Sequence, residues 1–307
     1  MKASFFRRYG GPEVLEYGDL PDPQPAAGEI LIDVHAASVN AADWKMRAGQ
    51  YGAAVGFPHV PGRDVSGVVA ALGSGANDFK VGEAVFAVCE VPREGAYAEK
   101  IAIRQEIVAR KPQKLTHAQT AAVALAGLTA SISLEETLKL QSGETILIQG
   151  GAGGVAGFAI ALAKHLGARV ITTASAKNHE YVRKLGADQV IDYHKQDFTK
   201  TLSDVDAVFD TVGGDVTERS FKVLKSGGRL ASVAVGGSPP PSPRSDVTSL
   251  RPKVNRDRPH LDRVGELVAK GVVPVPEIVE YPLAKAADAH RVSEARHLRG
   301  KLILKVR

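Results

Sequence analysis

The stretch ETILIQGGAGGVAGFAIALAKHL, residues 144–166, decides the fold. It opens with the short, β-branched run Thr145–Ile148, which predicts a buried strand of a parallel sheet. Glycines follow at once, and apolar residues then recur at helical spacing, which predicts an amphipathic helix that starts at the glycines. A strand, a glycine turn and a helix in this order are typical of a nucleotide-binding βαβ unit.

The glycine turn fits the pattern G-x-G-x-x-A at Gly151, Gly153 and Ala156. In that pattern the first small residue makes the tight turn, the second lets the backbone approach a pyrophosphate, and the third lets the helix pack on the strand. The free N–H groups at the start of the helix face the same pyrophosphate. The alternative is a glycine turn in another α/β protein, but the strand and helix around it favour a dinucleotide site. The residues expected to bind that cofactor are Gly151, Ala152, Gly153, Gly154 and Val155.

Length and composition limit the class of protein. The chain has 307 residues, enough for two domains, with 44% apolar and 24% charged residues, as in globular proteins. No run approaches 18 apolar residues and the N-terminus lacks the apolar core of a signal peptide, so we expect a cytoplasmic protein with no membrane partner. The net charge of +5 is small and the basic residues are scattered, so we expect no nucleic-acid partner.

Cys89 is the only cysteine, which excludes an intrachain disulfide and a multi-cysteine zinc cluster. It ends the strand-like run 84–89, so we expect a buried thiol and not a reactive one.

Short strands separated by glycines and prolines fill the first 115 residues and predict a compact, barrel-like β domain. The loop over residues 49–62 is rich in Gly, Ala and Pro and is expected to form a wall of a site. The strands are expected over residues 3–7, 30–39, 64–72, 84–88, 96–103 and 107–109.

From Thr116, a candidate N-cap, the pattern becomes helical and then alternates between strand and helix, which predicts a doubly wound parallel sheet. Pro252 leaves a sixth strand over 246–254 open, and a terminal strand over 301–306 could rejoin the first domain. We place one domain at 1–118 with 259–307 and the other at 119–258. Expected helices cover 118–125, 129–140, 178–185, 216–224 and 261–268; expected strands cover 145–148, 168–173, 189–193, 207–210 and 229–235, with a loop at 236–243.

These motifs together resemble the zinc-independent quinone oxidoreductases, the zeta-crystallin-like branch of the medium-chain dehydrogenase/reductases. The resemblance implies an α/β protein with a GroES-like β-barrel catalytic domain and a Rossmann domain, usually a homodimer. It implies NADPH-dependent hydride transfer to quinones or α,β-unsaturated carbonyls (enones). The likeness covers nearly the whole chain and rests on Val39–Lys45, Pro61–Val69, Phe79–Val85, Ala126–Ala130, the glycine loop, Lys184–Asp188, Asp210–Gly214 and Gly300–Leu304.

The resemblance also indicates whether the protein should bind zinc. Zinc-using alcohol dehydrogenase relatives have a cysteine where Asn40 stands and a histidine where Arg63 stands, and they carry four further cysteines in a structural zinc lobe. This chain lacks all of these, so we expect no metal and a carbonyl oxygen polarised by hydrogen-bond donors.

The end of the second strand of the parallel sheet lacks the acidic residue that binds the ribose hydroxyls of NAD. Ser175 and Lys177 stand there instead and can bind and neutralise a 2′-phosphate. The resemblance implies that Lys177, Tyr193 and Arg296 hold this phosphate, and we predict NADP(H) as the cofactor. The alternatives are an exposed lysine at a helix start, a packed tyrosine at a strand end and a surface arginine.

At the nicotinamide end, Thr129 and Val212 match family positions that touch the ring or its ribose. The alternative for Thr129 is a helix N-cap, and for Gly213–Gly214 an ordinary turn.

Asn40 to Lys45 is expected to form a strand-to-helix corner at the catalytic site. Enone-reducing family members carry a similar Asn-x-x-Asp-Trp/Tyr-Lys stretch, whereas several quinone-reducing relatives have tyrosine at the lysine position, so Lys45 favours enones. The proposed role of Lys45 is to donate a hydrogen bond to the oxygen that becomes negative. Asn40 would orient the ribose or donate to the same oxygen, and Tyr51 matches a tyrosine near the substrate.

Each of these residues also has a purely structural interpretation. Lys45 could be an exposed helix lysine and Tyr51 a packed loop residue. Trp44 is expected to pack, Asp43 to cap the corner, and Arg63 to form an ion pair with Asp64.

Two rival functions stay open at this point. One is an NAD-linked alcohol dehydrogenase of the same superfamily, and the other is a non-catalytic binder of NADPH or RNA. The sequence does not identify the physiological substrate.

Overall fold

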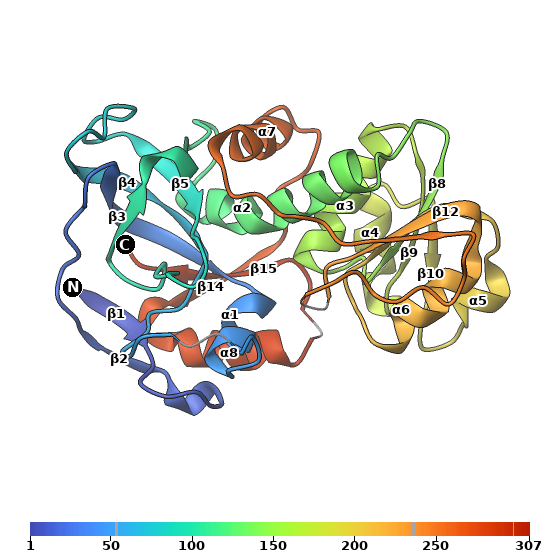
Figure 1. Cartoon of the computed structure of the whole chain (residues 1–307), viewed down its shortest axis with the longest axis horizontal. Helices are drawn as coiled ribbons and strands as arrows, with labels where there is room; N and C mark the ends of the chain where they lie inside the picture. The colour runs from blue at the N-terminus through green and yellow to red at the C-terminus, as the bar shows by residue number, and fades with distance from the viewer. Residues whose placement is uncertain (53–54, 235–236, 297) are drawn as a thin grey trace. The chain divides into compact units, whose positions relative to one another are not determined.

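The computed structural model describes residues 1–52, 55–234, 237–296 and 298–307 (Figure 1). The chain divides into two compact units, which are described separately. The first consists of residues 1–125, 256–269 and 275–307, and the second of residues 126–255 and 270–274. The domain boundaries expected from the sequence stay a prediction.

The first unit is built on a seven-stranded sheet around β3 (Glu29–Val39), which pairs antiparallel with β4, β6 and β15. The strand order is β14-β15-β3-β4-β5-β7, with β6 on β3. A separate antiparallel pair joins β1 (Lys2–Phe5) to β2 (Glu16–Asp19). The other strands are β4 (Asp64–Leu72), β5 (Ala84–Val88), β6 (Lys100–Arg104), β7 (Val108–Arg110), β14 (Ile278–Pro282) and β15 (Lys301–Lys305).

The alternating apolar residues of these strands fill one core, which includes Ile30, Ile32, Val65, Val85 and Leu302. Two register shifts between β3 and β4 bend the long central strand, as β-bulges do. The expected strand over 96–103 is shorter, because Ala98 makes only an isolated bridge to Ala3 before β6 begins. The C-terminal strand joins this sheet, as expected.

Among the described residues, four α-helices belong wholly or partly to the first unit: α1 (Ala41–Arg47), the start of α2 (His117–Ser131), α7 (Arg258–Ala269) and α8 (Ala286–Glu294). Helix α8 was not predicted from the sequence. Arg47 joins it to α1, because its buried guanidinium pairs with Glu294 and lies 3.0 Å from Nδ1 of His290. The Nε–H of Arg47 also donates to the Gly10 carbonyl oxygen at 3.1 Å.

Helix forms over 118–125 and 129–137 as expected, but the expected break between the two helices is wrong, because α2 continues across it and runs into a π-helix, η3 (Ile132–Thr137). The buried, alanine-rich run in α2 keeps the helix intact through Gly127. Thr116 does cap its start: the Gln119 amide donates to Thr116 Oγ1 at 3.2 Å, and the Thr116 amide donates to the Gln119 side chain at 2.9 Å.

The second unit is a six-stranded parallel sheet with the order β10-β9-β8-β11-β12-β13, which confirms the doubly wound arrangement. The sixth strand forms at the edge, where β13 (Thr248–Leu250) pairs with β12 and ends before Pro252. The other strands are β8 (Thr145–Gln149), β9 (Arg169–Thr173), β10 (Gln189–Ile191), β11 (Val205–Asp210) and β12 (Leu224–Ser232); the helices are α3 (Gly154–His165), α4 (His179–Lys184), α5 (Phe198–Thr201) and α6 (Asp215–Ser220).

Three expectations, two in this unit and one in the first, touch residues outside the described part of the chain. The strand expected to end at Val235 ends at Ser232, and residue 235 is not among the described residues. The same holds for Gly236 at the start of the expected 236–243 loop and for residues 53–54 of the 49–62 loop.

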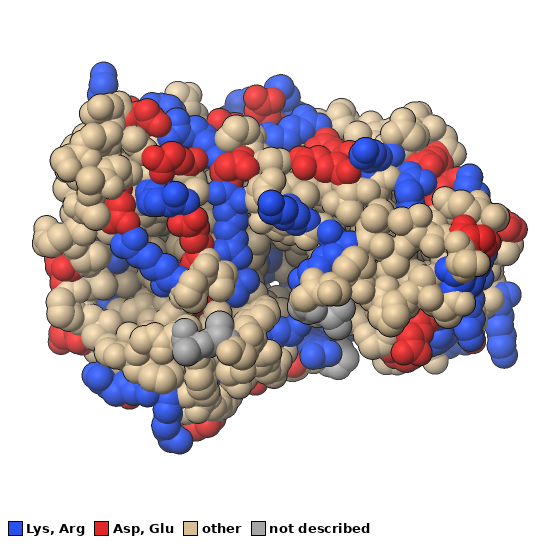
Figure 2. Space-filling view, viewed as in Figure 1, with Lys and Arg blue, Asp and Glu red and all other residues tan. Residues whose placement is uncertain are grey.

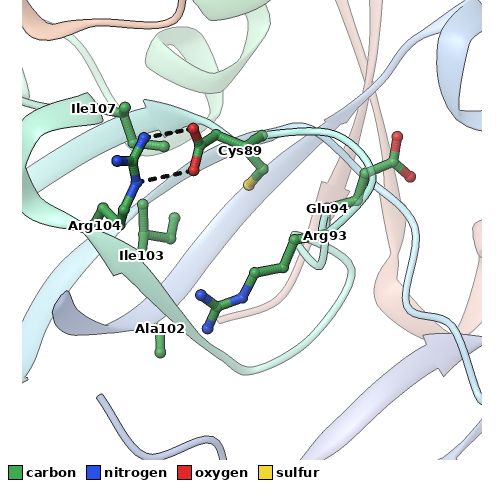
Figure 3. Close-up of a pocket in the computed structure, with 8 residues that line it drawn as sticks. Cys89, Arg93, Glu94, Ala102, Ile103, Arg104 and Ile107 are labelled. Carbon is green, nitrogen blue, oxygen red and sulfur yellow. Dashed lines mark hydrogen bonds and ion pairs between the residues drawn. The ribbon is translucent and has the colours of Figure 1, made fainter. Parts of the chain in front are cut away.

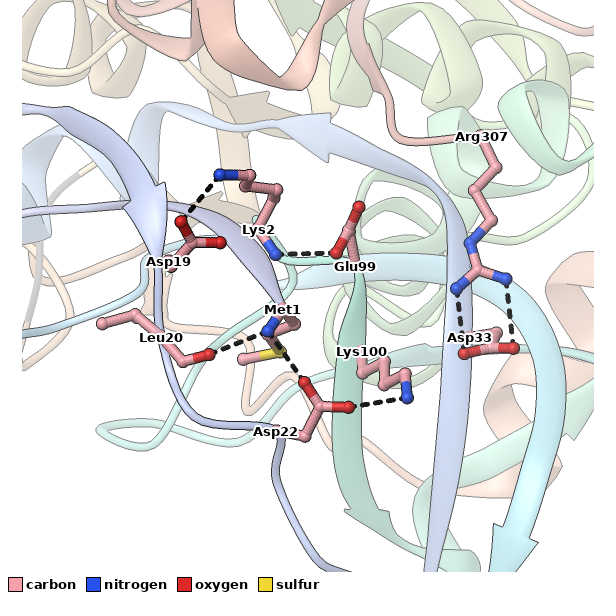
Figure 4. Close-up of polar contacts among 9 residues, drawn as sticks. All are labelled: Met1, Lys2, Asp19, Leu20, Asp22, Asp33, Glu99, Lys100 and Arg307. Atoms are coloured by element: carbon pink, nitrogen blue, oxygen red, sulfur yellow. Dashed lines mark hydrogen bonds and ion pairs between the residues drawn. The ribbon is translucent and has the colours of Figure 1, made fainter.

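Charged side chains tie the edges of the first unit together (Figure 4). Arg307 makes two bonds of 3.1 Å to the carboxylate of Asp33, and Lys100 donates to Asp22 at 2.7 Å. Such exposed pairs contribute little to stability, because water and salt screen their charges. Over the face drawn in Figure 2, lysines and arginines lie among aspartates and glutamates. None of the helices in the described part of the chain is long and apolar enough to cross a membrane.

Gly67 in β4 gives a test of the close β3–β4 pairing. A Cβ at this position would lie 2.1 Å from the Asp33 carbonyl oxygen. We expect Gly67→Ala to lower the free energy of unfolding by about 1–3 kcal/mol, measured by urea denaturation, because the strands must separate to admit the methyl group. Gly56→Ala is the control, since a Cβ there meets nothing within 4 Å, and an equal loss in both variants would contradict the packing argument.

Candidate cofactor and catalytic site

The glycine loop of the second unit leaves α3 with its N-terminus open. α3 begins at Gly154, so the first-turn amides of Gly154 and Val155 have no acceptor within the helix. The tight turn is made one residue earlier than expected, because the positive φ of +79° belongs to Gly150. Gly151 is required for a different reason: a Cβ there would lie 2.2 Å from Thr172 Oγ1. A Cβ on Gly153 would meet only the Gly150 carbonyl, at 3.5 Å, so the backbone there is open to a ligand.

The loop lies at the point where the strand order reverses, between β8 and β11. Ligands of doubly wound sheets bind at the carboxyl ends of the strands at this switch point. After β11, the buried carboxylate of Asp210 organises the turn: its Oδ1 accepts from the amides of Val212 at 2.9 Å and Gly213 at 3.1 Å. This turn leaves the Val212 side chain 44% exposed. Thr211 Oγ1 donates to the Gln149 carbonyl at 2.8 Å, which joins the turn to the end of β8.

The end of β9 carries a cation and no acid. Ser175 is buried, and its Oγ accepts from Asn178 Nδ2 at 3.2 Å. Lys177 lies on the exposed turn that follows, and Tyr193, just beyond β10, is 47% exposed with its ring 4.3 Å from that of His194. Tyr193 is therefore not a packed strand-end residue. The groups here that could bind a 2′-phosphate are the hydroxyls of Ser175 and Tyr193 and the ammonium of Lys177.

Thr129 lies near the end of α2 and is 8% exposed. The alternative that it caps a helix start is wrong, because α2 passes through it. Its carbonyl oxygen accepts from Ser133 Oγ at 2.5 Å, at the junction with the π-helix η3. π-Helical turns are frequent at functional sites.

In the first unit, Asn40 stands between β3 and α1, so the expected strand-to-helix corner is confirmed. Asp43 caps it, because its Oδ2 accepts from the Asn40 amide at 2.8 Å. The Asn40 side chain is held on two sides: Nδ2 donates to Asp64 Oδ2 at 2.8 Å, and Oδ1 accepts from Lys301 Nζ at 2.6 Å. Asp64 and Lys301 are functional candidates that the sequence analysis missed.

Lys45 is half-buried on α1, with its Nζ 5.8 Å from the centre of the Trp44 ring. The Arg296 guanidinium lies 5.8 Å from the same ring. Burial and, next, the charge of Arg296 lower the pKa of Lys45. Arg296 thus lies with Lys45 in the first unit. Lys177 and Tyr193, the other two residues expected to hold the 2′-phosphate, belong to the second unit. Trp44 is buried, as expected.

The expected Arg63–Asp64 ion pair is wrong. Arg63 Nε donates to Glu94 Oε1 at 2.7 Å, and both side chains are buried. Burial lowers the pKa of Arg63, but the carboxylates of Glu94 and then Asp43 outweigh it and leave the pKa raised.

Tyr51 covers this pair, with its ring centre 5.4 Å from the Arg63 guanidinium. The residue is 41% exposed, so it is only partly packed in the loop. Burial of the hydroxyl raises its pKa, and the positive charge of Arg63 opposes that shift.

Asp43 is fully buried, and its Oδ2 also accepts from the Tyr97 hydroxyl at 2.9 Å. Its Oδ1 has no hydrogen-bond partner among the residues that the structure describes. Burial and, next, the neighbouring charge of Glu94 raise the pKa of Asp43 to about 7. The cap of α1 is therefore a carboxyl group that holds its proton close to neutral pH.

Cys89 is 3% exposed, and burial raises the pKa of its thiol, so the expectation of a buried thiol is confirmed. It lines a small hollow with Ile103 and Ile107, which the charged residues Arg93 and Arg104 border (Figure 3). None of the predicted catalytic residues lines this hollow.

The donor set does not fit zinc. Among the described residues, no group of three or more His, Cys, Asp or Glu side chains could hold a metal ion. Asn40 is already bonded to Asp64 and Lys301, and Arg63 brings a positive charge where a ligand would have to donate electrons.

Comparison with known proteins agrees with this architecture. The family profile "Alcohol dehydrogenase GroES-like domain" matches residues 26–113, and "Zinc-binding dehydrogenase" matches residues 185–304. An NADPH-dependent alkenal/one oxidoreductase from Arabidopsis thaliana is 35% identical over 99% of this chain and 79% of the relative. The quinone oxidoreductase structure from Coxiella burnetii is 36% identical, with a TM-score of 0.91 over 100% of this chain and 99% of that chain.

A third relative is the Escherichia coli quinone oxidoreductase, solved as a complex with NADPH. It is 30% identical, with a TM-score of 0.90 over the full length of both chains. The chain belongs to the quinone oxidoreductase branch of the medium-chain dehydrogenase/reductase superfamily. The resemblance, and with it the GroES-like and Rossmann domains, is confirmed.

The buried carboxyl of Asp43 gives a pH test. Its pKa rises from 3.8 unfolded to about 7 folded, so the folded protein binds more protons between pH 4 and 7. The stabilisation from this group is present below pH 4 and is lost as the pH rises through 7. We expect Asp43→Asn, whose amide oxygen can accept the same two bonds, to gain stability relative to wild type over this range, by up to about 1.4 kcal/mol per pH unit.

The measurement is urea denaturation of both proteins at intervals from pH 4 to 8. Parallel stability curves would show that Asp43 ionises at its ordinary pKa. Asp19→Asn is the control, because that carboxylate is fully exposed and its pKa is lowered by the hydrogen bond from Lys2.

Proposed function

We propose that this protein is an NADPH-dependent, metal-free reductase that transfers hydride to α,β-unsaturated carbonyls or quinones. The observation that carries the proposal is the corner at Asn40–Lys45, where a half-buried lysine with a lowered pKa lies on Trp44. The open glycine loop supports the cofactor, and the relatives with alkenal/one and quinone oxidoreductase names support the substrate class.

The cofactor is held by residues of the second unit. The amides of Gly154 and Val155 at the start of α3 bind the diphosphate, with Gly151, Ala152 and Gly153 forming the loop. Ser175, Lys177 and Tyr193 bind the 2′-phosphate, with Arg296 as the further candidate from the first unit. Thr129 and Val212 contact the nicotinamide ribose or ring. NADPH supplies the hydride when bound.

The chain's own contribution to the reaction is electrostatic. As hydride adds to the β-carbon, the carbonyl π electrons move onto oxygen and give an enolate. Lys45 donates a charge-assisted hydrogen bond to that oxygen, and the nearby charge of Arg296 adds to the positive potential. Water then protonates the α-carbon, which completes the saturated product. Asn40 donates to the same oxygen or to the ribose, and Tyr51 borders the substrate.

An enone is the favoured substrate class, because an ammonium is a stronger donor to an enolate oxygen than the neutral hydroxyl of the tyrosine found in several quinone-reducing relatives. The domain division given above, a homodimer and a cytoplasmic location are also part of this proposal. The rival NAD-linked alcohol dehydrogenase would need an acid at the end of β9, where Ser175 and Lys177 stand.

The cofactor proposal predicts a preference for NADPH over NADH. In a thermal-shift experiment, NADPH at 100 times its dissociation constant stabilises by about 2.7 kcal/mol, and we expect a clearly smaller shift with equal NADH. Lys177→Ala should weaken NADPH binding about tenfold and leave NADH binding unchanged, because it removes one cation from the 2′-phosphate. Lys200→Ala, another exposed lysine of the second unit, is the control. Equal loss for both nucleotides would remove Lys177 from the phosphate site.

The catalytic proposal predicts that Lys45→Met lowers kcat for an enone by about 10² while the dissociation constant of NADPH changes little, because one oxyanion donor is lost. Stopped-flow NADPH oxidation with an enone and with a naphthoquinone measures both substrate classes. Lys80→Met, an exposed lysine of the same unit, is the control. Unchanged turnover in Lys45→Met would end the donor role.

A further inference from the structure

A buried lysine lies behind Asn40, and the reaction above gives it no role. Lys301, the first residue of β15, is only 5% exposed. Its Nζ donates to Asn40 Oδ1 at 2.6 Å and to the Val39 carbonyl oxygen at 3.2 Å, and it lies 3.8 Å from Asp64 Oδ2. Burial lowers the pKa of this ammonium, and the charges of Asp64 and Asp43 oppose the shift. A buried cation depends on such partners, since an unpaired one is strongly destabilising.

The carboxamide of Asn40 therefore lies between a cation and a carboxylate. Its oxygen accepts from Lys301 and its nitrogen donates to Asp64. A half-turn of the amide would bring its N–H groups against the ammonium and its oxygen against the carboxylate, so only one orientation is favourable. In that orientation one N–H bonds Asp64, and the second N–H is what Asn40 can offer to a ligand.

The same contacts strengthen that second N–H. An ammonium on the amide oxygen draws electron density from the nitrogen, because hydrogen bonds in a chain polarise one another. We propose that Lys301 is a positioning residue that acts through Asn40, fixing and polarising its amide as a donor to the bound ribose or to the substrate oxygen. This inference rests on the donor role given to Asn40 in the proposed function. Lys301 itself is too buried to meet a substrate.

A purely structural role is the rival explanation, in which Lys301 only joins β15 to the end of β3 through the Val39 carbonyl. Replacement by methionine would then alter stability but not function. A residue that acts through Asn40 must instead lose its effect once Asn40 is removed. A double-mutant cycle separates the two explanations, because it measures this dependence directly.

The experiment compares wild type, Lys301→Met, Asn40→Ala and the double variant. The readouts are kcat and KM for an enone and the dissociation constant of NADPH by fluorescence. We expect Lys301→Met to lower kcat or NADPH affinity about 10- to 100-fold, and the double variant to be within about threefold of Asn40→Ala. Lys305→Met, an exposed lysine of the same strand, should match wild type. Additive losses, or wild-type values in Lys301→Met, would overturn the inference.

A spectroscopic measurement covers the case in which Lys301→Met does not fold. In ¹⁵N-labelled wild type, the side-chain amide of Asn40 is assigned by its loss in Asn40→Ala. We expect one of its two proton resonances to be shifted downfield by the Asp64 carboxylate, and both to move in Lys301→Gln, which removes the positive charge from the amide oxygen. Unchanged resonances in Lys301→Gln, or wild-type shifts typical of a solvent-exposed asparagine, would overturn the inference. A wild-type protein with no reductase activity would contradict the proposed function. The spectrum would still decide the role of Lys301, because this measurement needs no turnover.

Discussion

The catalytic unit depends on the compensation of one buried negative charge. Asp64, at the start of β4, is fully buried and accepts hydrogen bonds from Ser38 Oγ, from Asn40 Nδ2 and, at 2.9 Å, from the Leu125 amide. An uncompensated carboxylate in such a place would cost several kcal/mol. Its partners come from β3, from the corner before α1, from α2 and, through Lys301, from the C-terminal strand. One charge thereby fixes segments that are far apart in the sequence.

The described part of this unit groups positive charges around aromatic and acidic side chains. Arg63 pairs with Glu94, while Lys45 and Arg296 lie on Trp44. Neither group can ligate zinc, but each can lower the energy of a negative oxygen. The guanidinium of Arg63 is planar and always charged, which suits a buried ion pair with a carboxylate. The ammonium of Lys45 is a compact charge with three N–H donors. The Arg63–Glu94 pair is buried, whereas Lys45 is half-buried and is the residue proposed to contact the substrate.

In the second unit, the parallel sheet determines where a ligand binds. The strand order reverses between β8 and β11, and the two loops that follow these strands carry the glycines and the Asp210 turn. Gly150 and Val212 approach so closely that a Cβ on the glycine would lie 3.0 Å from Val212 Cγ2. The residues proposed to bind the cofactor are therefore grouped by topology and not by a single motif.

The sequence by itself determined what is local: the strand, glycine turn and helix at 144–166, the N-cap at Thr116, the corner at Asn40 and the missing acid after β9. Each depends on neighbours along the chain, whose spacing can be read directly. Only the tertiary structure decided the partner of Arg63, the continuity of α2, the existence of α8 and the place of Lys301 behind Asn40. These depend on burial and on charge compensation between residues as far apart as Asn40 and Lys301, and no local pattern records which distant side chain supplies the compensating charge.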